Sequence, residues 1–249
     1  MIWNPFRRDP PPLHVSGEQW LAAEARLPFL ARLESGERQQ LRELALRFIA
    51  VKEWHGAQGL ALDAAMQLSI ALQACLPVLH LGLDWYDDWV GIVVYPGDFV
   101  IPRNVTDADG VVHEYDDAVL GEAWEGGPVL LSWFDDAAAS AGINVVIHEF
   151  AHKLDMRSGS ADGMPPLHAG MSARAWRAAL APAYADFCAR VDGGEDTALD
   201  PYAAESPAEF FAVMSEAFLE TPELLYREYP QVYSQLALFY RCERRDTKV

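Results

Sequence analysis

The chain contains the segment Asn144-Val145-Val146-Ile147-His148-Glu149-Phe150-Ala151-His152-Lys153-Leu154-Asp155, and within it the pattern H-E-x-x-H. Residues four apart lie on one face of an α-helix, so His148 and His152 can bind one metal ion together. Glu149 projects from the adjacent face, where its carboxylate can reach a water on that ion. The pattern therefore predicts the helix of a zinc peptidase, with two histidine ligands and Glu149 as the general base.

The residues before His148 favour a buried helix, because Ile143, Val145, Val146 and Ile147 are all apolar. Imidazole and carboxylate groups inside a protein need polar partners, and a metal ion supplies them. The alternative is a core in which the three side chains are hydrogen-bonded and no metal is bound.

Composition limits the function classes that the chain can belong to. The 249 residues carry a formal net charge of −18, which argues against binding to nucleic-acid phosphates or to an anionic membrane surface. Cys75, Cys188 and Cys242 are widely spaced and odd in number, as expected for reduced thiols rather than a disulfide framework. The N-terminus has no apolar signal segment, and no apolar stretch is long enough to span a bilayer. We therefore expect a soluble, cytoplasmic protein.

Hydrophobic periodicity predicts a mixture of helices and strands. Helical patterns cover residues 18–54, 62–74, 173–191, 206–221 and 222–241, and strand patterns cover residues 76–83, 89–96, 99–102 and 129–133. The strand at 129–133 lies shortly before the H-E-x-x-H helix. We expect it at the edge of the sheet, where an extended substrate can pair with it.

These elements predict an α+β fold in which helices pack on a small mixed sheet. Residues 1–14 are rich in proline and are expected to form an extended arm. Residues 15–249 are expected to form a single metallopeptidase domain, with an N-terminal helical portion at about 15–80 and a catalytic core at about 81–245.

A catalytic zinc ion needs a third protein ligand, and the nearby sequence does not supply an obvious one. In the longer metzincin pattern, a glycine and a histidine would stand where this chain has Asp155 and Ser158. Asp155 shares the helical face of the two histidines, so it could ligate, brace a neighbouring group or form a salt bridge at the helix end. His168 could be a ligand from a loop, although a surface histidine is the simpler interpretation.

Glutamates on a later helix are the remaining candidates for the third ligand. Ser206-Pro207-Ala208-Glu209 has the residues of a capping box, which would explain Glu209 without any metal. Glu216 follows seven residues later on the same face and could support the site or be solvated. Spacing alone leaves Glu205, Glu209 and Glu216 as alternatives.

Several segments resemble the Mlc titration factor A family of zinc peptidases. The resemblance extends over about residues 30–240, and it is carried in order by residues 127–133, 144–155, 161–167 and 200–213. It implies a fold like the catalytic domain of anthrax lethal factor, aminopeptidase-type activity on a peptide or protein substrate, and one zinc ion. The family's ligands correspond to His148, His152 and Glu209, and its active-site tyrosine corresponds to Tyr202.

The expected reaction is hydrolysis of a peptide bond by a zinc-activated water. Glu149 would take the proton from this water, and the hydroxyl of Tyr202 would stabilise the oxyanion. Without the resemblance, a core tyrosine would be the preferred interpretation of Tyr202. The resemblance also implies a second partner, a DNA-binding repressor of sugar uptake genes similar to Mlc. The competing hypothesis is a regulatory binding protein that sequesters a transcription factor and has weak or incidental peptidase activity.

Overall fold

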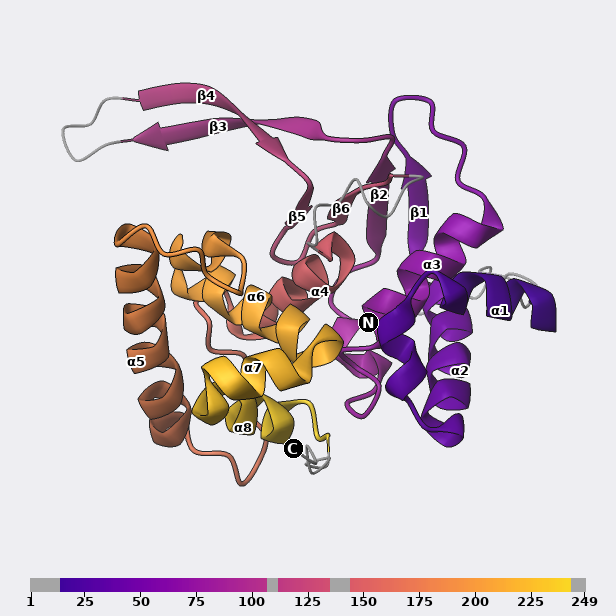
Figure 1. Cartoon of the computed structure of the whole chain (residues 1–249). Coiled ribbons are helices and arrows are strands. Elements are labelled where there is room, and N and C mark those ends of the chain that lie inside the picture. Colours follow the sequence, from indigo (N-terminus) through magenta and orange to yellow (C-terminus); the bar gives the residue numbers. More distant parts are fainter. Residues whose placement is uncertain (1–13, 107–111, 135–143, 243–249) are drawn as a thin grey trace.

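The computed structural model describes residues 14–106, 112–134 and 144–242 (Figure 1). The extended arm predicted for residues 1–14 lies outside these residues except for its last position. Among the described helices, none combines the length and the apolar character needed to cross a membrane.

The N-terminal part is helical, as predicted. The single helical pattern of residues 18–54 comprises α1 (Gly17–Ala25), the 3-10 helix η1 (Pro28–Arg32) and α2 (Ser35–Val51). Helix α3 (Ala64–Cys75) follows, and its residues from Leu68 onward are buried. The polar side chain of Ser16 begins α1 through a capping box with Gln19.

The strand predicted for residues 76–83 is wrong. Leu76, Val78 and Leu79 each donate a backbone hydrogen bond to a carbonyl three residues earlier, so the chain continues in tight turns. The short helix η2 (Leu83–Tyr86) ends this segment. A short apolar run is compatible with a buried strand or a buried helical turn, and periodicity does not separate the two.

A four-stranded mixed sheet lies at the centre of the fold. Its order is β1 (Glu53–Gly56), β2 (Gly91–Tyr95), β6 (Val129–Ser132) and β5 (Gly121–Ala123). The pairs β1–β2 and β2–β6 are parallel, and β5–β6 is antiparallel. The small mixed sheet is therefore confirmed.

The strand predicted at 129–133 exists as β6, but its expected position at the sheet edge is wrong. β6 lies between β2 and β5, so the three-residue strand β5 forms this edge. A strand this short, beginning with a glycine, has too little alternation to be recognised in a sequence.

Strands β3 (Phe99–Thr106) and β4 (Val112–Val119) form a separate antiparallel hairpin. Figure 1 shows this hairpin extending away from the central sheet, above the C-terminal helices. It leads directly into β5, so its base adjoins the edge of the sheet.

The C-terminal half is helical and begins with α4 (Val145–Asp155), which lies between the sheet and the later helices (Figure 1). The following elements are η4 (Met156–Ser158), α5 (Ala173–Asp192), η5 (Pro201–Ala204), α6 (Pro207–Glu220), α7 (Pro222–Glu228) and α8 (Pro230–Phe239). The helix predicted for residues 222–241 is interrupted at Tyr229, because Pro230 starts a new helix.

One hydrophobic cluster includes buried residues of the N-terminal helices, the sheet and the C-terminal helices. Phe48 of α2, Phe150 of α4 and Phe211 of α6 are all fully buried within it. The predicted α+β fold is confirmed, and its core fixes α4 from both sides.

Candidate active site

Helix α4 carries the H-E-x-x-H pattern in the interior of the protein. Asn144 caps the helix by accepting a hydrogen bond from the backbone N–H of Ile147 at 2.9 Å. All 11 residues of α4 are buried. His148, Glu149 and His152 are each less than a tenth exposed, so their polar atoms depend on partners from other elements.

Glu209 reaches the two histidines from the first turn of α6. The hydroxyl of Ser206 caps this helix and accepts a hydrogen bond from the backbone N–H of Glu209 at 3.1 Å. The carboxylate of Glu209 does not bond back to Ser206. Its Oε2 lies 2.9 Å from Nε2 of His148 and 3.2 Å from Nε2 of His152. Capping therefore explains the position of Ser206 but not the direction of the Glu209 side chain.

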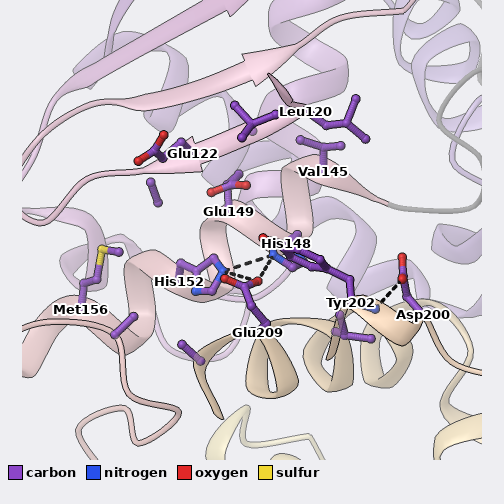
Figure 2. A pocket seen from close by; sticks show the side chains of 16 residues that line it. Leu120, Glu122, Val145, His148, Glu149, His152, Met156, Asp200, Tyr202 and Glu209 are labelled. Carbon is purple, nitrogen blue, oxygen red and sulfur yellow. Dashed lines mark hydrogen bonds and ion pairs between the residues drawn. The ribbon is translucent and has the colours of Figure 1, made fainter. Parts of the chain in front are cut away.

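The three atoms form a compact set of potential metal ligands (Figure 2). The two Nε2 atoms lie 3.1 Å apart. A tetrahedral zinc ion with bonds of ~2.0 Å holds its ligand atoms roughly 3.3 Å apart, which is close to the three observed separations. Within the described part of the chain, His148, His152 and Glu209 are the residues whose ligand atoms converge in this way.

The charges of this cluster also suit a cation. Burial alone would raise the pKa of Glu209, but its hydrogen bonds with His148 and His152 lower the pKa to about 2. The carboxylate therefore stays ionised near neutral pH. Two imidazole nitrogens and one carboxylate oxygen are a donor set that zinc commonly takes, and three protein ligands leave a position for substrate or water.

Glu216, about two turns further along α6, orients His148 from the opposite side. Its Oε1 lies 2.7 Å from Nδ1 of His148, and its Oε2 accepts a hydrogen bond from the backbone N–H of Asn144 at 2.9 Å. A proton on Nδ1 leaves the lone pair of Nε2 available to a metal. Burial lowers the pKa of His148, but the hydrogen bonds with Glu209 and Glu216 raise it well above its usual value.

Glu149 lies between the metal-ligand cluster and strand β5 (Figure 2). Burial raises the pKa of its carboxyl group to about 7, although the two histidines oppose this shift. A carboxylate with a pKa near neutrality is suited to accept and release a proton at physiological pH.

Strand β5 is held over α4 by Lys153. The ammonium group of Lys153 donates to the carbonyl oxygens of Trp124 at 2.6 Å and of Gly127 at 2.9 Å. Both carbonyls belong to the turn between β5 and β6. This buried lysine therefore fixes the edge of the sheet relative to the helix that carries the histidines.

A cavity of about 560 Å³ lies over these groups and is lined by residues of β5, α4, η5 and α6. Tyr202 lines it from η5, where its backbone N–H donates to Asp200 at 2.9 Å. The ring of Tyr202 lies 6.0 Å from the ring of His148 and its residue is 51% exposed. Tyr202 is therefore not a core tyrosine, and it lies at the mouth of the cavity (Figure 2).

The other candidates from the sequence lie outside the ligand cluster. Asp155 is fully buried and accepts a hydrogen bond from the backbone N–H of Gly163 at 2.7 Å, so it braces the following loop. His168 contacts the carbonyl of Phe239 at 2.7 Å, and Glu205 is exposed at the end of η5. The sequence did not decide whether Glu216 supports the site or is solvated. Its seven-residue spacing from Glu209, which places both on one helix face, was the only local indication of a role in the site.

Comparison with known proteins gives a consistent result. Residues 7–241 match the family described as glucose-regulated metallo-peptidase M90. The chain is also similar to proteins named Mlc titration factor A from Yersinia pestis (strain Pestoides F) and Yersinia pseudotuberculosis serotype O:1b (strain IP 31758). Each is 40% identical over 228 residues, which are 90% of this chain and 84% of the relative.

Proposed function

Because this chain belongs to the glucose-regulated metallo-peptidase M90 family, we propose that it is a zinc-dependent peptidase whose ion is held by His148, His152 and Glu209. The observation that carries the proposal is the convergence of their three ligand atoms, with Glu216 orienting one of the histidines. A zinc ion bound there would supply a Lewis acid and a water acidic enough to lose a proton near neutral pH.

Glu149 is the proposed general base. Its buried carboxylate would accept a proton from the attacking water and then donate it to the leaving amine. The pKa of about 7 supports both steps, because neither the protonated nor the ionised form is strongly disfavoured at neutral pH. The hydroxyl of Tyr202, at the mouth of the same cavity, would donate a hydrogen bond to the oxyanion that forms from the scissile carbonyl.

Strand β5 is the proposed binding edge for the peptide substrate. The backbones of Leu120 and Trp124 bond toward β6, with distances of 2.7 and 3.1 Å. Hydrogen-bonding directions alternate along an antiparallel strand, so the N–H and C=O groups of Gly121 and Ala123 face the open edge. An extended peptide can pair with these groups and cross the cavity above Glu149.

The finer parts of the proposal concern the kind of peptidase, its location and its partner. We propose aminopeptidase-type cleavage and a cytoplasmic location. The cytoplasmic location is supported by three free cysteines in the described residues.

The name Mlc titration factor A, carried by the relatives, favours a second function in which the protein binds a repressor similar to Mlc. The two functions are compatible, since a protein surface and a zinc site can act independently.

The test is metal analysis combined with chelator-sensitive cleavage of matched peptides with free and blocked N-termini. We expect one zinc per chain, loss of cleavage with a chelator, and cleavage of the free peptides alone. Glu149→Gln should retain zinc and lose turnover, whereas the control Glu205→Gln, at a nearby exposed glutamate, should retain both zinc and turnover. Undiminished turnover in Glu149→Gln would contradict the assignment. Repressor binding that persists in Glu149→Gln would separate the binding function from catalysis.

A further inference from the structure

Gly121, the first residue of β5, lies directly against the side chain of Glu149. A Cβ atom built on Gly121 would be 2.5 Å from Oε1 of Glu149, 2.6 Å from its Cγ and 2.7 Å from Cγ1 of Val145. Ordinary contacts to a Cβ atom begin near 3.4 Å. Even the alanine side chain therefore does not fit unless Glu149 or the strand moves by about an ångström.

Space, rather than backbone conformation, requires glycine at this position. Gly121 is not among the glycines with a left-handed φ, so other residues could adopt its backbone conformation. Strand β2 of the same sheet offers a comparison, because a Cβ on Gly91 would meet only Pro128, with its Cβ at 3.1 Å and its Cα at 3.6 Å. The crowding at Gly121 involves the carboxylate that we propose as the general base.

We infer that Gly121 is a positioning residue for Glu149, an inference that rests on the proposed peptidase function. The missing side chain lets the buried carboxylate lie immediately beneath the strand whose open edge would hold the substrate. The same residue thus presents backbone N–H and C=O groups to the peptide and leaves room for the base on the face toward α4.

The consequence is a short path between the base and the bond to be cleaved. A side chain at position 121 would displace the carboxylate of Glu149 by about an ångström, and a misplacement of this size costs on the order of 10²-fold in rate. The three atoms nearest to this Cβ belong to Glu149 and Val145 rather than to the proposed metal ligands His148 and His152. Metal binding should therefore survive a substitution that impairs catalysis.

The test is Gly121→Ala, compared with Gly91→Ala in the same sheet and with Gly36→Ala, where nothing lies within 4 Å of the new Cβ. We expect Gly121→Ala to retain its zinc and a KM within about 3-fold, while kcat falls on the order of 10²-fold. Both control variants should retain kcat. A crystal structure of Gly121→Ala should show the Glu149 carboxylate displaced, a readout that does not depend on activity.

The double variant Gly121→Ala/Val145→Ala distinguishes the effect of the contact with Glu149 from that of the contact with Val145. Its kcat is compared with that of Val145→Ala. The double variant removes the apolar contact, so it also provides a folded background if Gly121→Ala alone is unstable. We expect kcat to stay low, because the contact with Glu149 persists. Recovery of kcat in the double variant, a loss confined to KM, or an unchanged kcat in Gly121→Ala would overturn the inference. If Glu149→Gln keeps full turnover, the proposed function itself fails, which is a different result.

Discussion

The burial of Glu149 predicts that its replacement by glutamine stabilises the metal-free protein at neutral and alkaline pH. Glutamine has nearly the same shape as glutamate but carries no charge. Glu149 is only 6% exposed as a residue. Burial raises the pKa of its carboxyl group from 4.5 to about 7. Ionising this group inside the folded protein is therefore unfavourable, and glutamine avoids that cost.

The magnitude follows from the pKa. The folded state binds this proton more tightly than the unfolded state, so Glu149 contributes most to stability below pH 4.5 and loses that contribution as the pH rises to about 7. A rise from 4.5 to about 7 corresponds to about 3 kcal/mol, of which about 2.5 kcal/mol falls between pH 5 and pH 8. Glu149→Gln does not titrate, so its advantage over the wild type should grow by this amount across the same interval.

The assay is urea unfolding of both proteins at pH 5 and pH 8 after removal of metal with a chelator. The difference in unfolding free energy should increase by about 2.5 kcal/mol toward pH 8, equivalent to roughly 5–10 °C in Tm for a chain of this size. Added zinc should reduce the difference, because a nearby cation favours the ionised carboxylate. A difference that does not change with pH, or a wild type that is the more stable protein at pH 8, would refute this reasoning.

Three further predictions concern individual residues of the site. Glu216→Gln should weaken zinc binding by roughly 10- to 100-fold in competition with a chelator, because the histidine that it orients loses a carboxylate partner, while Glu220→Gln should not. Glu209→Gln should lose zinc. Ser206→Ala should keep zinc and lower the unfolding free energy by about 1 kcal/mol, because the helix cap is lost. Zinc loss in both variants would contradict the separation between Glu209 as a metal ligand and Ser206 as a helix cap. Tyr202→Phe should lower kcat on the order of 10²-fold at unchanged zinc content, and an unaltered kcat would exclude it from oxyanion stabilisation.

The edge strand illustrates where sequence reasoning failed. The pattern at residues 129–133 correctly predicted a strand, but its place in the sheet depended on which strand came to lie beside it. β5 has three residues, and its pairing with β6 is determined by the turn that Lys153 holds against α4. A lysine next to the H-E-x-x-H pattern gives no sign in the sequence that it fixes the edge strand of the sheet.

Glu209 and Asp155, two candidates for the third metal ligand, also show what local sequence patterns cannot reveal. Both carboxylates had an ordinary local explanation, a helix cap and a helix-end contact. In the structure, Glu209 turns toward the two histidines, while Asp155 bonds the loop at Gly163. A side chain's rotamer and its distant partner decide between such roles, and neither is encoded in local spacing.

The sequence by itself determined that His148 and His152 share one helix face with Glu149 beside them, because residues four apart lie on the same face wherever that helix is placed. It also determined the mixture of helices and strands, and family resemblance indicated Glu209 and Tyr202. Only the tertiary structure placed Glu209 against His148, which is 61 positions away, Glu216 behind His148, and Gly121 above Glu149. These arrangements depend on how α6 and β5 pack against α4, and packing between distant segments has no periodic signal along the chain.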